Sequence, residues 1–369
     1  MKNMREACNV IIIDPVGKKA GLDHYNDSLA KSLNKLDVLV RVYSNYKSEY
    51  SEPVFKFRFG KSIFFLPEMF FSLMKVFKNL KQQKPDIVIL HLFNATRASI
   101  SLSSEIKKQN IKLVYILHDI ESLIDEVSNN NQLNICLQLA DEIVVHNHFT
   151  ASELLKKNPG AEKKVSIIPH GDFLELPSSV SKDDAIAQLG LDKKMPKVLF
   201  FGMIKPTKGL DVLLKAMQKI NAQVIVAGRV RKQSMSDYAE AFSDLKKQGK
   251  LVTDINYITN EKRDLYFKSA DVIVLPYTKI YQSGVLLMAM SYGIPVIASD
   301  LQPNLEFASE IDCMEFFRVG DHLMLERVMS SLLANRDRRD VLRKNGFSVL
   351  ESSHNWNKIA NSFKQIICR

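Results

Sequence analysis

The chain has 369 residues, of which 46% are hydrophobic and 25% are charged, and its formal net charge is +10. This length exceeds one ordinary hydrophobic core and predicts two domains of similar size. The composition excludes a disordered or fibrous protein, and the lack of an apolar run of roughly 18 residues excludes a membrane-spanning helix. The four cysteines form no Cys-x-x-Cys pair, and no signal-peptide pattern is visible, so we expect a cytoplasmic protein with reduced thiols.

Short β-branched runs alternate with helical patterns in the first half of the chain. We expect strands at residues 9–13, 38–42, 87–90, 112–117, 142–145 and 166–168. Helices are expected at residues 22–36, 67–83, 95–109 and 150–157. This alternation is typical of βαβ units and predicts a parallel sheet.

Much of the positive charge lies in one segment of the first half. Between Phe55 and Lys84 there are seven Lys or Arg residues against one acidic residue, and eight phenylalanines are interleaved with them. A basic, aromatic, amphipathic segment is typical of a surface that rests on anionic lipid headgroups. The alternative is a helix whose apolar face packs into the core while its lysines are solvated. Because no nucleic-acid-binding signature accompanies the charge, a nucleic-acid partner is disfavoured.

A polar stretch at residues 175–182 is the predicted linker, after which the alternation restarts. Strands are expected at residues 198–201, 223–227, 251–255, 272–275 and 295–298. Helices are expected at residues 208–220, 234–248, 262–268 and 283–292, and over the last ~50 residues. Two Rossmann-like domains of this kind are expected to face one another across a cleft at the carboxyl ends of their strands, where ligands bind.

Two loops of the second half could hold an anion. In the first, Gly202 lets the backbone approach a ligand, and Lys208 beside a helix N-terminus would meet a diphosphate with a full charge. In the second, Ser283 is a good N-cap and Gly284 leaves the first N–H groups of a helix unobstructed. The alternatives are an ordinary loop with solvated lysines and an ordinary capped core helix.

A histidine lies directly after the strand expected at residues 112–117. At this place His118 could hydrogen-bond a substrate hydroxyl, although a lone histidine can also be purely structural. His91, His146 and His170 also lie near expected strand ends, and of these His170 is the one expected to reach the cleft. The spacing of the histidines predicts no metal site. The loop at residues 14–21 lacks the Gly-x-Gly-x-x-Gly pattern, which argues against an NAD(P) or FAD enzyme.

Together these features resemble the GT-B glycosyltransferases, and specifically the large family-four group of retaining, nucleotide-sugar-dependent enzymes. The resemblance covers nearly the whole chain and is strongest over residues 198–306, through FFGMIKPTKGLDVLLKAM, VIVAGR, DVIVLPY, QSGVLLMAMSYGIPVIASD and NLE. In the first half it rests on AGLDHYNDSLAKSL, LHD and VSIIPHG. It implies an acceptor-binding domain at 1–178, a donor-binding domain at 179–350, and a C-terminal helix at 351–369 that packs back on the first domain.

The resemblance also implies roles for individual residues. Lys208 would bind the donor diphosphate and His118 would contact the transferred sugar, which makes these two the implied catalytic residues. The other implied donor-binding residues are Gly21, Gly202, Lys205, Arg229, Ser283, Gly284, Val285 and Glu306. Possible cleft-lining residues are Asp119, His170, Gly171 and Met288.

The chain departs from the family pattern at several positions. The two glutamates that the family commonly carries eight positions apart are replaced by Ile280 and Met288. Met203 stands where a basic residue is usual, and Lys205 would take its place. These departures leave ribose binding and the retaining outcome without their usual residues.

The resemblance implies transfer of a hexose from a UDP- or GDP-sugar to a glycan or lipid-linked acceptor in cell-surface polysaccharide biosynthesis. Neither a cofactor nor a metal ion is expected, and the segment between Phe55 and Lys84 would rest on the inner face of the cytoplasmic membrane. One alternative is an epimerase or phosphorylase of the same fold. Another is a catalytically silent GT-B module that binds sugar nucleotides or a partner enzyme.

Overall fold

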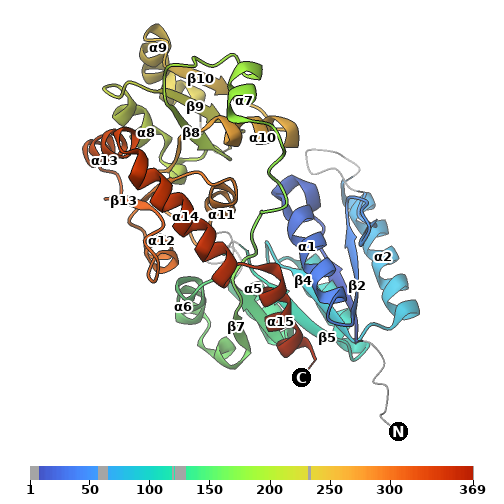
Figure 1. Ribbon diagram of the computed structural model, residues 1–369. Helices are drawn as coiled ribbons and strands as arrows, with labels where there is room; N and C mark the ends of the chain where they lie inside the picture. The colour runs from blue at the N-terminus through green and yellow to red at the C-terminus, as the bar shows by residue number, and fades with distance from the viewer. Residues whose placement is uncertain (1–7, 57–64, 119, 121–129, 232–233, 369) are drawn as a thin grey trace. The chain divides into compact units, whose positions relative to one another are not determined.

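The structure is a computed structural model that describes residues 8–56, 65–118, 120, 130–231 and 234–368, and it divides into two compact units (Figure 1). The first unit comprises Met1–Gly171 together with His354–Arg369, and the second comprises Asp172–Ser353. These divisions lie a few residues from the boundaries expected at 178/179 and 350/351. Each unit is an α/β structure with one parallel sheet.

The sheet of the first unit has seven parallel strands in the order β3-β2-β1-β4-β5-β6-β7. The strands are β1 (Cys8–Ile13), β2 (Val38–Ser44), β3 (Ser51–Pro53), β4 (Ile87–His91), β5 (Lys112–Ile116), β6 (Glu142–Val145) and β7 (Val165–Ile167). The central strands are buried on both faces, as expected for a parallel sheet covered by helices on each side. Because β1 pairs with both β2 and β4, the chain reverses its direction of strand addition there, and ligands bind at such a switch point.

Helices cover both faces of this sheet. On one face α1 (Leu22–Asn34) packs with α15 (Trp356–Ile367) over a shared apolar cluster. On the other face α3 (Arg97–Lys108) contacts α2 (Phe65–Gln83) and α5 (Asn130–Leu139), and the Ser103 hydroxyl of α3 bonds to the Tyr115 hydroxyl of β5. The described part of the unit also contains the helices α6 (His148–Lys157), η1 (Gly17–Ala20) and η3 (Pro159–Lys164).

The C-terminal helix α15 belongs to the first unit. Its residues Trp356, Ile359 and Phe363 are buried in the same cluster as the apolar face of α1. Two lysines attach the helix at its end: Lys364 Nζ donates to the Leu36 carbonyl oxygen at 2.7 Å, and Lys112 Nζ donates to the Ile366 carbonyl oxygen at 2.5 Å.

The sheet of the second unit has six parallel strands in the order β10-β9-β8-β11-β12-β13. The strands are β8 (Lys197–Phe201), β9 (Gln223–Ala227), β10 (Leu251–Asp254), β11 (Val272–Leu275), β12 (Val296–Ser299) and β13 (Glu315–Phe317). One face carries α8 (Leu210–Met217), α9 (Ala239–Lys247) and α13 (His322–Ala334). The other carries α7 (Lys182–Gln188), α10 (Asn260–Ser269), α11 (Gly284–Ser291) and α14 (Arg336–Ser353).

The stretch expected to be a linker is attached to the second unit. The Ser178 backbone N–H donates to Asp264 Oδ1 at 3.0 Å, and the Ser178 hydroxyl bonds to the other carboxylate oxygen. At Lys182 the chain already enters α7, which sequence patterns did not predict. The helix expected at 208–220 is in fact a short turn, η4 (Pro206–Lys208), a glycine, and then the shorter helix α8.

Candidate active site

In the second unit, the turn that carries Lys208 is held by close backbone contacts at the carboxyl edge of the sheet. Gly209 has φ +63°, and a Cβ atom there would fall 1.8 Å from the Pro276 carbonyl oxygen. The Thr278 N–H donates to the Thr207 carbonyl oxygen at 3.0 Å. Because Pro276 and Thr278 follow β11, these contacts fasten the Lys208 turn to the loop that leads into α11.

Lys208 is positioned by a buried aromatic ring. Its Nζ lies 3.6 Å from the centroid of the Tyr277 ring, which is a cation–π contact. Burial raises the pKa of Tyr277 to about 12, with the neighbouring Ser283 hydroxyl opposing the shift. The ring therefore stays uncharged and orients the ammonium group without neutralising it.

The N-terminus of α11 lies beside the end of β8. Ser283 is its N-cap, as predicted, and the Ser283 hydroxyl accepts the Leu286 N–H at 3.2 Å. A Cβ atom at Gly202 would lie 3.6 Å from Cγ2 of Val285, so the first turn of α11 lies next to the residue that follows β8. Since the first N–H groups of a helix have no intrahelical partner, Gly284 and Val285 offer donors at this edge.

Among the buried polar atoms near this turn that lack a hydrogen-bond partner within the described residues, two lie directly beside implied donor-binding residues. They are Oγ1 of Thr207 and Oε1 of Gln282. Native proteins leave few such atoms unpaired, and those that remain often mark strained or ligand-binding positions. One lies next to Lys208 and the other next to Ser283, so both belong to the same edge.

The other implied donor-binding residues of the second unit lie around this turn or after neighbouring strands. Lys205 is half-buried at the start of η4. Arg229 is exposed just after β9, and its carbonyl oxygen accepts the Ile204 N–H at 2.9 Å. Glu306 is half-buried on the short helix α12 (Gln302–Phe307), which follows β12.

The positions of the two absent glutamates are apolar in structure as well as in sequence. Ile280 and Met288 are half-buried and pack against the core cluster that includes Leu287 and Met290. These side chains offer no hydrogen bond to a ribose. Met288 therefore contributes apolar packing to α11.

In the first unit, four histidines gather around Tyr25 of α1. His91 ends β4, His118 and His146 follow β5 and β6, and His170 comes three residues after β7. Their ring centroids lie 4.8 to 6.0 Å from that of Tyr25. Neighbouring parallel strands thus bring together histidines that are far apart in the sequence.

Three of these rings are joined by hydrogen bonds. Nδ1 of His91 lies 2.7 Å from Nε2 of His118, and Nδ1 of His118 lies 3.1 Å from Nε2 of His146. Nδ1 of His146 lies 2.8 Å from the carbonyl oxygen of Ile168. His118 is therefore the middle member of a chain, which its position in the sequence did not reveal.

Burial keeps these histidines uncharged. Desolvation lowers the pKa of His91 to about 3 and that of His146 to about 4. Desolvation, with neighbouring histidines adding to it, also holds the pKa of His118 and of His170 well below the usual value. The cluster consequently presents neutral imidazoles, which suit the hydroxyl groups of an uncharged ligand.

The segment containing His170 and Gly171 packs against the start of the C-terminal helix. A Cβ atom at Gly171 would fall 2.1 Å from the Trp356 ring, so only glycine fits against the indole. The His354 ring donates from Nδ1 to the His170 carbonyl oxygen at 2.6 Å.

Asp119 lies outside the described residues. Among the described residues, no group of three His, Cys, Asp or Glu side chains is arranged to hold a metal ion.

The loop that precedes Gly21 is fixed by a buried carboxylate that sequence analysis overlooked. Asp14 accepts the Val16 N–H at 2.9 Å, the Gly17 N–H at 3.1 Å and the Asn26 side-chain N–H at 2.7 Å. Burial raises the pKa of Asp14. Gly21 has φ +72° and nothing within 4 Å of its Cβ position, so the start of α1 is open on that side.

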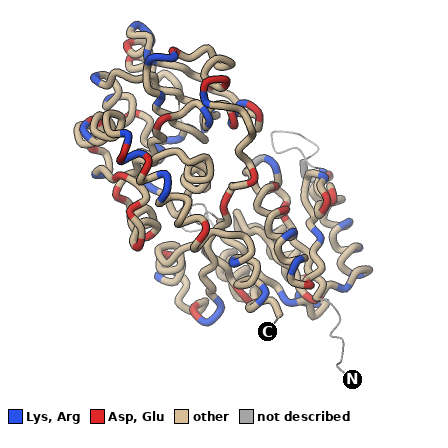
Figure 2. Tube along the Cα trace, viewed as in Figure 1, with Lys and Arg blue, Asp and Glu red and all other residues tan. Residues whose placement is uncertain are grey.

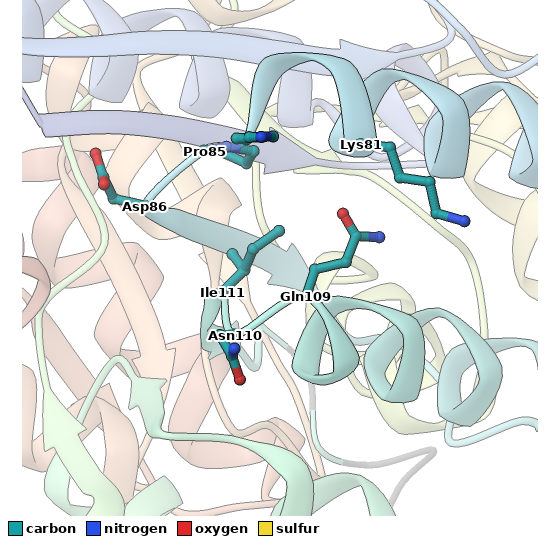
Figure 3. A pocket seen from close by; sticks show the side chains of 7 residues that line it. Lys81, Pro85, Asp86, Gln109, Asn110 and Ile111 are labelled. Carbon is teal, nitrogen blue, oxygen red and sulfur yellow. The ribbon is translucent and has the colours of Figure 1, made fainter.

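A hollow of about 570 Å³ lies at the opposite edge of the first sheet (Figure 3). It contains none of the residues implied by the family resemblance. Its lining comes from the ends of α2 and α3 and the starts of β4 and β5: Lys81, Lys84, Pro85, Asp86, Gln109, Asn110 and Ile111.

Comparison with known proteins decides the family. Residues 20–171 match Glycosyltransferase Family 4, and residues 181–349 match Glycosyl transferases group 1. This chain is a GT-B glycosyltransferase of the family 4-like group. The lipopolysaccharide 1,2-N-acetylglucosaminetransferase of Salmonella typhimurium is 21% identical to this glycosyltransferase over 309 residues, which is 79% of the chain and 75% of that protein.

Solved structures share the fold of this glycosyltransferase. Sucrose-phosphate synthase from Thermosynechococcus elongatus has a TM-score of 0.74 and 20% identity, with 97% of this chain and 98% of that chain covered. Anabaena HepE in complex with UDP and glucose has a TM-score of 0.72 and 17% identity, with 97% of this chain and 99% of that chain covered. These structures confirm the predicted two-domain α/β fold, and the family models confirm the predicted transferase class.

Replacing Gly209 tests how closely its backbone approaches Pro276. Gly190 has the same φ of +63° but open space around its Cβ position, which makes Gly190→Ala the matched control. The left-handed backbone should cost each variant about 1–2 kcal/mol. Gly209→Ala should lose a further 1–3 kcal/mol or so, because its methyl group forces the packing apart. Urea unfolding followed by circular dichroism measures both, and equal losses would show that a methyl group at position 209 meets no obstruction at Pro276.

Acidification should destabilise the first unit through its buried histidines. Unfolded histidine titrates near pH 6.5, whereas His91 and His146 stay neutral when folded, so this stability is present above pH 6.5 and is lost below it. By linkage each should cost about 1.4 kcal/mol at pH 5.5. The fluorescence of Trp356, the only tryptophan, reports urea unfolding of this unit.

The variant His146→Gln isolates the contribution of one histidine. Between pH 7.5 and 5.5, the free energy of unfolding of this variant should fall less than that of the natural chain. The difference is the contribution of His146. The raised pKa of Asp14 has the opposite effect on stability as the pH falls. Because Asp14 is present in both proteins, its contribution cancels in the comparison. Identical pH profiles for the two proteins would contradict a neutral His146 in the folded state.

Proposed function

We propose that this glycosyltransferase transfers a hexose from a UDP- or GDP-sugar to a glycan or lipid-linked acceptor, with retention, in cell-surface polysaccharide biosynthesis. The observation that carries the proposal is the pairing of Lys208 with the N-terminus of α11 at one edge of the second sheet. The likeness to a lipopolysaccharide N-acetylglucosaminetransferase supports the pathway. The likeness to a protein with bound UDP and glucose supports the donor class.

The chemical task of the Lys208 turn is to stabilise a leaving group. As the glycosidic bond of the donor breaks, negative charge develops on the nucleotide diphosphate. The ammonium group of Lys208 and the N–H groups at Gly284 and Val285 are positioned before that charge appears, so little reorganisation is needed. Lys205 adds a second positive charge nearby, and the dipole of α11 favours an anion at its N-terminus.

The remaining donor residues serve the nucleotide and the sugar in this proposal. Arg229 follows β9, where family members line the nucleotide pocket, and Glu306 lies on α12 after β12. Gly21 and the neutral His118 belong to the first unit and are the residues that the resemblance assigns to the sugar. The acceptor hydroxyl attacks from the side of the leaving group, which gives retention. No metal-dependent step is part of this proposal.

Substituting Lys208 tests the proposed role of the turn. Removing one main group that stabilises charge in a preorganised site costs about 3–4 kcal/mol, so Lys208→Ala should lower kcat by a factor of roughly 10² to 10³. Transfer is measured with a panel of UDP- and GDP-sugars and glycan or lipid-linked acceptors. Binding of UDP and GDP is followed by thermal shift, where ligand at about 100 times its Kd adds about 2.7 kcal/mol to stability.

The control is Lys193→Ala, which removes an exposed lysine of the same unit. It should retain both the transfer rate and the thermal shift. Near-normal kcat in a folded Lys208→Ala protein would contradict the leaving-group role. Tight donor binding without turnover over the whole acceptor panel would contradict the proposed transfer reaction.

We also propose that α2 rests on the inner face of the cytoplasmic membrane. Phe70, Phe71 and Met74 on this helix are 58%, 70% and 49% exposed, and Lys75 and Lys78 are exposed next to them. Figure 2 marks the Lys and Arg positions along the chain in blue. Residues three, four and seven apart share a helix face, so the apolar and basic groups form one stripe. Such a stripe combines apolar insertion with attraction to anionic headgroups. Residues 57–64 of this basic segment lie outside the described residues, and no described helix is long and apolar enough to cross a membrane.

Removing the aromatic side chains of α2 should weaken binding to vesicles. Phe70→Ser/Phe71→Ser should bind vesicles of mixed phosphatidylcholine and phosphatidylglycerol at least tenfold more weakly, since burying one phenylalanine contributes about 1.5–3 kcal/mol. Co-sedimentation at low and high salt measures the binding. Leu323→Ser, which changes a side chain 52% exposed in the second unit, is the control and should bind normally. Equal binding by the double variant would exclude α2 as the contact.

A further inference from the structure

The hydrogen-bonded histidines carry information about where their protons lie. A carbonyl oxygen can only accept, so the bond to Ile168 requires that Nδ1 of His146 carries the hydrogen. A neutral imidazole has a single N–H, which leaves Nε2 of His146 as an acceptor. The bond from His118 must then be donated by Nδ1 of His118.

The same reasoning extends to the next ring. Nε2 of His118 is now an acceptor, so Nδ1 of His91 must donate the remaining bond. All three rings are therefore Nδ1–H tautomers, and the chain has a direction. It begins at Nε2 of His91, a buried acceptor that has no partner among the described residues, and it ends at a backbone carbonyl group.

We propose that His91 and His146 are positioning residues that hold His118 in its Nδ1–H tautomer, so that the three rings act as one unit with its accepting end at Nε2 of His91. The bond to Ile168 fixes the hydrogen of His146 on Nδ1, so that Nε2 of His146 accepts from Nδ1 of His118. Nδ1 of His91 donates to the lone pair on Nε2 of His118. The catalytic part of this proposal rests on the proposed function, whereas the order of the tautomers does not.

This arrangement changes what His118 can do alone. Both of its ring nitrogens are already hydrogen-bonded to neighbouring histidines, at 2.7 Å and 3.1 Å. A ligand hydroxyl that bonds to His118 must replace one of these links, whereas a hydroxyl that reaches the buried, unpaired Nε2 of His91 needs to replace none.

Packing around the chain supports its rigidity. The planes of the His91 and His118 rings lie within 2° of parallel with their centroids 4.9 Å apart, and the Tyr25 ring meets both edge-on at 5.6 and 4.8 Å. His91 and His146 are only 3% and 6% exposed, so water competes little for these bonds. Burial also keeps both rings neutral, as the chain requires.

Nitrogen NMR of the full-length protein with 15N-labelled histidine tests the tautomers directly at pH 7.5. The chain has eight histidines, which single substitutions assign. His91, His118 and His146 should each show a protonated Nδ1 and an unprotonated Nε2. An Nε2–H tautomer or an imidazolium at any of the three would overturn the proposal. This measurement needs no enzymatic activity, so its failure is distinct from failure of the proposed function.

Two substitutions of His146 then separate positioning from packing. His146→Leu removes the acceptor and should release His118 to the Nε2–H form, with kcat at least tenfold lower and the donor KM within twofold, because a wrong histidine tautomer is costly. His146→Gln provides an amide oxygen in its place and should keep both the tautomer and most of kcat. His354→Gln changes a histidine that is not one of the three hydrogen-bonded rings, and it should leave the tautomer of His118 unchanged.

The contrary result is equally definite. If Leu and Gln at position 146 lower the stability and kcat alike while His118 keeps its tautomer, His146 only packs, and the proposal is wrong. If His146→Leu does not fold, the spectrum of the natural chain and that of His146→Gln still decide the question.

Discussion

Parallel pairing of short, buried strands is the constraint on which both candidate regions depend. In the first unit, β4, β5 and β6 are neighbours and end at the same edge, so the residues that follow them meet whatever their distance in sequence. In the second, β8 pairs with β11, which brings Gly202 next to the first turn of α11. Because side chains alternate between the faces of a strand, a slip of one residue would move every side chain of that strand to the opposite face of the sheet. Burial of the core residues therefore also determines which residues lie at the carboxyl edge of each sheet.

Backbone crowding, rather than side-chain packing, shapes the turn that carries Lys208. A Cβ atom at Gly228 would fall 1.7 Å from the Gly202 carbonyl oxygen, and one at Gly209 would meet Pro276 about as closely. Glycine at these places lets three loop segments approach within backbone contact. Lys208 consequently projects from a stiff turn onto the Tyr277 ring. A long, flexible side chain is thus presented with less freedom than it has at an open surface.

Sequence periodicity predicted the long elements well because they bury enough residues to show it. It missed β3 and β13, which have three residues each, and α7 and α12, which have seven and six; it also missed the ten-residue helix α5. In the candidate site, Ser283 as an N-cap could be predicted because capping is local, and the observed start of α11 agrees with it. His91 and His146 were seen only as scattered strand-end residues, because their contact depends on strand order. The support that Asp14 gives to the first loop also needs coordinates, since Asn26 lies a helical turn beyond Gly21.

The two units handle charge in opposite ways. The second presents an ammonium group and helix N–H donors, which suit a diphosphate, whereas the first presents neutral imidazoles, which suit hydroxyl groups. The difference follows from burial. Solvated histidines with a pKa near 6.5 would be partly protonated at neutral pH, and a protonated ring has no lone pair with which to accept. Desolvation removes that competing state from His91 and His146, so a directional chain of three rings can persist where free imidazoles would repel one another as cations.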